Sequence, residues 1–156
     1  MRYINKIIIH CTGNRPHCTL GMADFKRIAQ SAGHRTYSYH YYIFEDGTVC
    51  EGQAISQPGT HCKSYNSHSI GVAYVGGLDK NGSPCDTRTA AQKQAMLQLV
   101  AKLILMYRCD VYGHRDLSPD KNRDGRITKD EWIKDCPCFD AREEYHGIYK
   151  KIVLGG

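Results

Sequence analysis

Near the start of the chain lies the stretch Tyr3-Ile4-Asn5-Lys6-Ile7-Ile8-Ile9-His10. Its run of isoleucines predicts a buried strand that ends at His10. A second short strand, Cys109-Asp110-Val111-Tyr112-Gly113, ends in the same way at His114. If the two strands run parallel in one sheet, both histidines lie at its carboxyl edge, where open α/β sheets place their ligands.

Helices and strands alternate along the rest of the chain. Thr19 is a candidate N-cap for a first helix whose apolar stripe includes Ile28, and Gly33 is suited to end it in the left-handed conformation. Thr89 begins the clearest helix, because Gln92 completes a capping box. The other predicted elements are strands at 37–44, 49–51 and 69–75, with an Asp46-Gly47 hairpin turn between the first two, and a last helix at about 140–149. This alternation predicts a mixed α/β fold.

Length and composition favour one domain that spans residues 1–156, with 41% hydrophobic residues to form its core. The formal net charge is +5, but basic and aromatic residues do not interleave as they do in nucleic-acid modules. No apolar run approaches the ~20 residues that span a bilayer. The N-terminus resembles no signal peptide, so we expect synthesis in the cytoplasm and mostly free thiols among the eight cysteines.

The two strand-end histidines suggest a metal site. A catalytic zinc site needs three protein ligands and one open position, and it favours neutral imidazole and thiolate donors. His10, His114 and one cysteine of the pair Cys136 and Cys138 satisfy this requirement, and the residues alone do not decide between the two cysteines. Neither Cys-x-x-Cys nor His-Glu-x-x-His occurs, so the zinc-finger and zincin classes are not supported.

The polar segment between His114 and Cys136 contains a second candidate metal site. At about 120–131 it matches the calcium loop of an EF-hand, which takes oxygen ligands at positions one, three, five, seven and twelve and a glycine at position six. The incoming helix of an EF-hand is missing, since Leu117-Ser118-Pro119 precedes the loop. An ordinary polar surface turn is therefore the alternative. The matching residues are Asp120, Asn122, Asp124, Gly125, Arg126 (through its backbone carbonyl) and Glu131.

Six short motifs, in this order, resemble the zinc-dependent N-acetylmuramoyl-L-alanine amidases, a family that includes bacteriophage amidase lysozymes and peptidoglycan recognition proteins. The resemblance covers roughly residues 5 to 145, and Val75-Gly76-Gly77-Leu78-Asp79 favours the phage branch. The motifs are Ile8-Ile9-His10-Cys11-Thr12, Ser38-Tyr39-His40-Tyr41, Asp46-Gly47-Thr48, His61 through Asn66 to Val72, Gly113-His114-Arg115-Asp116, and Lys134 to Asp140.

The resemblance implies a single amidase domain with a central mixed β-sheet flanked by helices. It implies zinc held by His10, His114 and Cys136, whereas Cys138 occupies a position where the family tolerates other small residues. The implied reaction is hydrolysis of the amide bond between N-acetylmuramic acid and L-alanine in bacterial peptidoglycan. Zinc supplies that reaction with a nucleophile by lowering the pKa of bound water towards ~7.

Two further residues match the catalytic positions of the family. Lys134 is expected to stabilise the oxyanion that forms when the amide carbonyl is attacked. Tyr39 is expected to orient the attacking water or assist proton transfer. Strand alternation predicts that Tyr39 faces the same side as Tyr41 and the opposite side from His40.

His61 and Asn66 resemble positions that hold the substrate near the metal, and a loop role without substrate contact is the alternative for both. We expect a monomeric phage-type endolysin that acts on the cell wall after release or export by another factor. Two other classes stay open: a peptidoglycan-binding module without catalysis, and a cysteine hydrolase that uses Cys11 or Cys62 as nucleophile.

Overall fold

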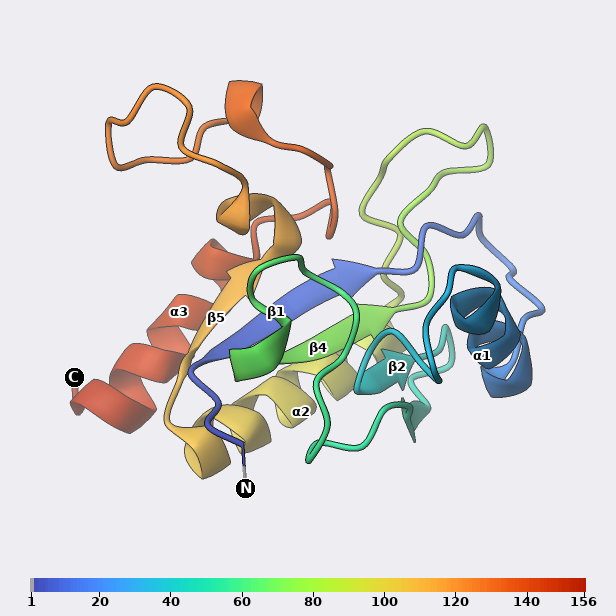
Figure 1. Ribbon diagram of the computed structural model, residues 1–156, viewed down its shortest axis with the longest axis horizontal. Helices are drawn as coiled ribbons and strands as arrows, with labels where there is room; N and C mark the ends of the chain where they lie inside the picture. Colours follow the sequence, from blue (N-terminus) through green and yellow to red (C-terminus); the bar gives the residue numbers. More distant parts are fainter. Residues whose placement is uncertain (1) are drawn as a thin grey trace.

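The computed structural model describes residues 2–156, which form one five-stranded sheet flanked by helices (Figure 1). The strand order is β3-β2-β4-β1-β5. β1 pairs in parallel with β4 and β5, and β2 pairs in parallel with β4, whereas β2 and β3 form an antiparallel hairpin. The predicted mixed sheet is therefore confirmed. The strands are β1 Lys6–Cys11, β2 Tyr41–Ile43, β3 Val49–Glu51, β4 Ser69–Tyr74 and β5 Asp110–Gly113.

The pairing of β1 with β5 confirms the parallel arrangement expected from the two strand-end histidines. Ile9 lies opposite Gly113, so the residues that follow them, His10 in β1 and His114 directly after β5, are brought to the same edge of the sheet. β1 begins at Lys6, three residues later than predicted, because the preceding segment makes only isolated contacts such as the hydrogen bond from Asn5 N to His68 O (2.9 Å).

Two helices cover one face of the sheet, α2 (Ala90–Tyr107) and α3 (Ala141–Tyr149), and α3 continues into a π-helical turn, η4 (Lys150–Leu154) (Figure 1). Thr89 caps α2 as predicted, since its hydroxyl accepts from Gln92 N at 3.0 Å and the Gln92 side chain accepts from Thr89 N. Apolar side chains of both helices pack on β1 and β4. This face is the main core, and its buried members include Ile7, Ile9, Ile70, Val72, Met96, Val100, Leu103, Ile104 and Tyr145.

The opposite face carries helix α1 (Met22–Ser31) at the β2 end, where Phe25 packs with Tyr42 and Val75. The predicted cap is wrong: α1 begins after Gly21, whose N–H donates to the Asp24 carboxylate at 2.8 Å, and Thr19 lies outside it. The predicted apolar stripe is too wide as well, because Ile28 is 52% exposed.

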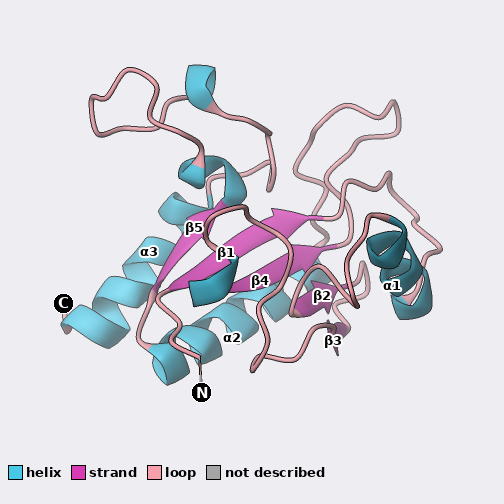
Figure 2. Cartoon of the chain, in the orientation of Figure 1, coloured by secondary structure: helices cyan, strands magenta, loops and turns pink. Residues whose placement is uncertain are grey.

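Loops rather than helices occupy the rest of this second face and the carboxyl edge of β1, β4 and β5 (Figure 2). They contain three 3-10 turns: η1 (Asn66–His68), η2 (His114–Leu117) and η3 (Lys129–Glu131). Side chains alternate between the two faces along β1. Ile7 and Ile9 lie in the helix-covered core, so His10 points to the opposite, loop-covered face. The fold thus leaves His10 facing the segments that bring the other candidate site residues.

Candidate metal centre

His10 is the fifth residue of β1 and is only 1% exposed. Burial lowers the pKa of its imidazole well below the ordinary value, and unfavourable electrostatic interactions of the protonated ring with His61, His114 and Lys134 lower it further. The ring is therefore neutral at physiological pH. Neutral imidazole is the form that binds a metal ion.

His114 starts η2 immediately after β5, and its ring centroid lies 4.7 Å from that of His10. Gly113, the last residue of β5, makes room for the third candidate ligand. A Cβ at this position would come within 2.9 Å of Pro137, so a larger residue would displace the chain that carries Cys136. The N–H of Gly113 donates to the Asp116 carboxylate at 2.6 Å, which fixes the turn into η2.

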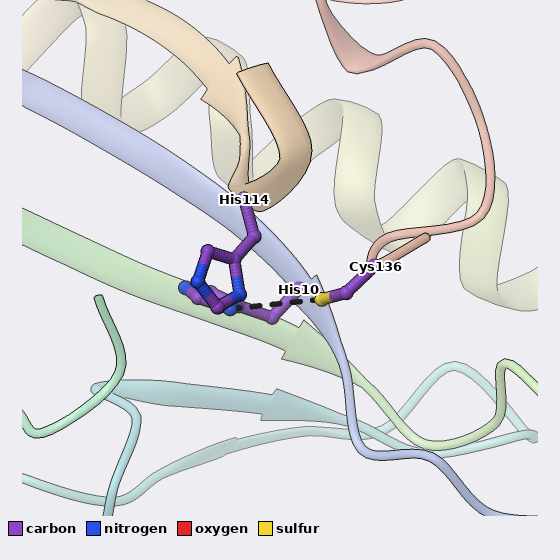
Figure 3. A group of neighbouring side chains, drawn as sticks. All are labelled: His10, His114 and Cys136. Atoms are coloured by element: carbon purple, nitrogen blue, oxygen red, sulfur yellow. Dashed lines mark hydrogen bonds between the residues drawn. The ribbon is translucent and has the colours of Figure 1, made fainter. Parts of the chain in front are cut away.

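Cys136 lies on the segment that returns to the sheet edge, and its thiol points toward His10 (Figure 3). Its sulfur lies 3.7 Å from His10 Nδ1 and accepts the N–H of Cys11 at 3.3 Å. The buried Tyr74 hydroxyl donates to the carbonyl of Pro137 at 2.6 Å, which anchors the next residue. The ligand atoms of His10, His114 and Cys136 all lie within 4.8 Å of one another.

Cys138 does not join this group. Its thiol donates to the carbonyl of Gly77 at 3.4 Å, and its hydrogen bond with Cys11 raises its pKa together with burial. The residues alone left open which of the two cysteines joins the histidines. In the structure, Cys136 is the one that lies within ligand distance of His10 and His114. The donor set of two imidazoles and one thiol, clustered at one strand edge, fits a zinc ion with an open fourth position.

Tyr39 lies beside this cluster, with its ring centroid 4.9 Å from that of His10. Burial raises the pKa of its phenol well above the ordinary value, so the hydroxyl stays protonated. The alternation predicted for 37–44 is wrong, because the strand contains only Tyr41–Ile43. Tyr39 packs with the α1-side cluster that contains Tyr42, whereas Tyr41 packs against the main core.

His61 is a closer neighbour of His10 than the sequence indicated. Its Nδ1 lies 2.9 Å from His10 Nε2, and its Nε2 lies 3.3 Å from the hydroxyl of Ser69. Burial lowers the pKa of His61 to about 3, and unfavourable electrostatic interactions of the protonated ring with His40, His114 and Arg2 act in the same direction. A contact with the neutral ring of His10 gives His61 a part in orienting that ring, for which the sequence held no signal.

The side chain of Asn66 shapes the loop that carries His61. Its Oδ1 accepts the backbone N–H groups of His61 and Cys62, each at 2.9 Å. This supports the loop role that was the alternative for Asn66. Substrate contact by His61 or Asn66 stays a prediction.

Lys134 is exposed and lies at the rim of the cluster, where it lines a small pocket of about 70 Å³ together with His114 and Ile133. Its charge contributes to the lowered pKa of His10. An ammonium group in this position is available to a negatively charged or polarised group that enters the pocket.

The second predicted cluster also forms. Oxygen atoms of Asp120, Asp124 and Glu131 lie within 4.8 Å of one another, at the end of the molecule that holds the loop between η2 and η3. Asn122 lies in the same turn, where its Nδ2 donates to Asp124 at 3.2 Å. Arg126 directs its backbone N–H to Asp124 Oδ1 at 2.8 Å.

The chain is similar to a known family and to several known proteins. The sequence pattern of the N-acetylmuramoyl-L-alanine amidase family matches residues 1–130. A protein of Haemophilus influenzae with no assigned function is 44% identical over 97 residues, which cover 62% of this chain and 84% of that protein. The endolysin of Klebsiella phage KP32 is 32% identical over 139 residues, which cover 88% of this chain and 83% of the endolysin.

Solved structures show the same fold. The amidase LysC from Clostridium intestinale superimposes with a TM-score of 0.71 at 22% identity, covering 97% of this chain and 86% of LysC. The architecture of the sheet and its helices is therefore shared along almost the whole chain.

Proposed function

The chain belongs to the N-acetylmuramoyl-L-alanine amidase family, and we propose that it cleaves peptidoglycan with a zinc ion held by His10, His114 and Cys136. Its function is that of a peptidoglycan amidase, in keeping with the phage endolysins that it resembles over most of its length. The observation that supports the zinc assignment is the convergence of two imidazoles and one thiol, whose ligand atoms lie within 4.8 Å of one another. The family match ends at residue 130, so the assignment of Cys136 rests on this geometry.

The donors fit zinc in kind as well as in position. A tetrahedral site with Zn–N of about 2.1 Å and Zn–S of about 2.3 Å places ligand atoms roughly 3.5 Å apart. Cys136 Sγ and His10 Nδ1, at 3.7 Å, already have that separation. The N–H of Cys11 points at the sulfur, which stabilises the thiolate that a metal requires.

Bound zinc supplies Lewis acidity, which activates water at neutral pH and polarises the scissile carbonyl. Three residues around the metal site support the other parts of the reaction. Lys134 presents a positive charge to the oxyanion that develops on the carbonyl. Tyr39 offers a protonated phenol next to His10, able to orient water or pass a proton. His61 restrains the ring of His10.

Neither alternative class is favoured. A binding module without catalysis has no need of a converging ligand set or of Lys134 beside it. A cysteine hydrolase needs a thiol with a lowered pKa, whereas the hydrogen bond with Cys136 raises the pKa of Cys11 to about 12. Cys62 is only 5% exposed, so substrate would have to displace the packing around it.

We place the action of the protein at the cell wall, reached after release or export by another factor, by analogy with the endolysins that it resembles. Within residues 2–156, none of the helices combines the length and apolar character needed to cross a membrane.

Digestion of purified peptidoglycan followed by mass analysis of the products tests this function. We expect intact glycan strands and free stem peptides whose new amino terminus is L-alanine. Muropeptides with cut glycan would instead identify a glycosidase and would overturn the proposal.

A further inference from the structure

The loop 120–131 contains chemistry that the amidase reaction does not use. Its sequence, Asp120-Lys-Asn-Arg-Asp-Gly-Arg-Ile-Thr-Lys-Asp-Glu131, fills every ligand position of an EF-hand calcium loop. The structure brings oxygen atoms of Asp120, Asp124 and Glu131 within 4.8 Å of one another, although these residues lie up to eleven positions apart. All three belong to the loop itself. Three of the side chains that the sequence pattern predicts as ligands therefore lie close together in the structure.

A buried atom without a hydrogen-bond partner is the first indication of a cation site in this cluster. Asp120 Oδ1 is sealed from solvent and has no hydrogen-bond partner among residues 2–156, while Oδ2 of the same carboxylate accepts the N–H of Gly125 at 2.8 Å. A buried oxygen of this kind is costly unless it is hydrogen-bonded or coordinates a metal. Asp120 Oδ1 therefore has its coordination capacity unused.

Glu131 gives a second indication, because its carboxylate is buried (4% exposed) without a compensating positive charge. It accepts the backbone N–H of Lys121 at 2.6 Å and both the N–H and the hydroxyl of Thr128 at 3.3 and 3.2 Å. Among the described residues, the ion pairs within 4 Å involve other carboxylates. Buried carboxylates are normally paired with a cation or bound to a metal.

The type of donor selects the type of ion. Carboxylate, amide and backbone carbonyl oxygens favour hard cations, and soft thiolate or imidazole donors are missing from loop 120–131. A loop that offers six or seven oxygens, with a bidentate glutamate last, suits Ca²⁺ better than Mg²⁺, which demands octahedral geometry. Asn122 Oδ1 accepts the N–H of Asp124 at 3.1 Å and keeps a second lone pair for an ion.

We propose that residues 120–131 bind one Ca²⁺ ion through the side chains of Asp120, Asn122, Asp124 and Glu131 and the backbone carbonyl of Arg126. A hydrogen bond holds the two ends of the loop together in place of the incoming helix. Ile133 N donates to the hydroxyl of Ser118 at 3.1 Å. The site therefore does not need the paired helices of an EF-hand.

The bound ion would order one wall of the cleft next to the zinc centre. Ile127 and Ile133 of this segment line a pocket of about 470 Å³ together with Tyr65 and Leu117. Trp132, next to Glu131, stacks on the guanidinium of Arg115, which follows His114 (3.9 Å to the ring centroid). Calcium binding itself does not rest on the proposed amidase function.

Calorimetric titration of the zinc-loaded protein with CaCl₂ alone tests the site. We expect one equivalent of Ca²⁺ to bind with a dissociation constant below about 1 mM, the weak limit for EF-hand-like modules. Glu131→Gln should weaken binding by roughly 100-fold or more, because it removes the bidentate ligand of the loop. The matched control is Asp130→Asn, a change at the exposed neighbouring position that supplies no ligand.

A second readout guards against a variant that fails to fold. Asp124→Asn changes an exposed side chain and should weaken binding while leaving the circular dichroism spectrum unchanged. Tb³⁺ added to the parent protein should emit through Trp132, the only tryptophan of the chain, and excess Ca²⁺ should quench that emission. Cys136→Ser should keep Ca²⁺ binding, which separates this site from the zinc centre.

Two results would overturn the proposal. One is a parent protein that takes up no Ca²⁺ at about 10 mM, well above the weakest EF-hand-like affinities. The other is equal binding by the parent, Glu131→Gln and Asp124→Asn. Neither result would bear on peptidoglycan cleavage, which is measured separately by product analysis.

Discussion

The two clusters of metal-ligating side chains in this protein are built in opposite ways. His10, His114 and Cys136 are drawn together over as many as 126 positions of sequence by the pairing of β1 with β5 and the return of the chain past Gly113. Asp120, Asp124 and Glu131 belong to one continuous loop. The first cluster is therefore a product of the whole fold, whereas the second is a local structure that the fold only carries.

This difference predicts how each region responds to change. Removal of a donor from the sheet-edge cluster should abolish function without affecting the loop, and removal of a loop donor should leave zinc in place. Variants in each cluster test whether the two metal sites are independent.

The largest effect is expected for Cys136→Ser, which removes a direct ligand. Loss of a partner one step further from a metal already costs ~10–100-fold in affinity or activity, so zinc content and turnover should both fall by more than about 100-fold. Elemental analysis and product release measure the two quantities.

Cys138→Ser and Glu131→Gln are the controls for Cys136→Ser, and both should keep zinc. If Cys138→Ser lost zinc while Cys136→Ser kept it, the ligand assignment would be reversed. Loss of zinc in Glu131→Gln would show that the two clusters are not independent.

Lys134→Ala should keep zinc and lose turnover, because its charge acts on the transition state and not on the metal. Removal of one oxyanion-stabilising group typically lowers kcat by ~10²–10³-fold. Lys80→Ala, an exposed lysine on another loop, is the matched control. Unchanged kcat in Lys134→Ala would exclude this lysine from the mechanism.

Tyr39→Phe removes the phenol and preserves the ring that packs 4.9 Å from His10. A lost proton-transfer or water-orienting group should lower kcat by ~10²-fold, at the low end for general acid–base catalysis. Tyr37→Phe, in the same aromatic cluster, should have little effect. A variant as active as the parent would leave Tyr39 with a packing role alone.

The last prediction concerns stability in acid, which the buried His40 beside the sheet-edge cluster should lower. Burial, with a smaller contribution from Arg2, lowers the pKa of His40 to about 4, and its Nδ1 accepts the N–H of Gly71 at 3.0 Å. Between pH 6.5 and 4 the unfolded chain therefore binds a proton that the folded protein excludes. Stability is present above pH 6.5 and is lost as pH falls, by up to about 3 kcal/mol in all.

Urea unfolding at pH 4.5 to 6 measures this contribution as a slope. His40→Gln should lower the dependence of the unfolding free energy on pH by up to about 1.4 kcal/mol per pH unit. His68→Gln, a change at an exposed histidine, is the control. Equal slopes in the parent and His40→Gln would contradict the buried neutral state of His40.

Much of this molecule was predictable because its signals are local or periodic. The isoleucine run, the Thr89–Gln92 capping box and the Asp46-Gly47 turn predicted their elements, and the strand-end histidines predicted the edge where the first cluster lies. The spacing of the calcium loop is likewise contained in one stretch of sequence.

The remaining features depend on contacts between distant segments. Which cysteine approaches His10 is decided by the packing of Pro137 against Gly113, and no local pattern encodes that contact. The orientation of Tyr39 was mispredicted because alternation was extended beyond the true strand. The contact between His61 and His10 joins a loop to a strand, so periodicity could not reveal it.

Reconstitution of the metal-free protein tests whether His10, His114 and Cys136 form the zinc centre of an amidase. Metal-free protein is titrated with zinc while release of stem peptides from peptidoglycan is followed. Activity should rise in proportion to zinc up to one equivalent per chain, and calcium alone should not restore it. Full turnover by the metal-free protein, or restoration of activity by calcium without zinc, would exclude zinc-dependent cleavage at this cluster.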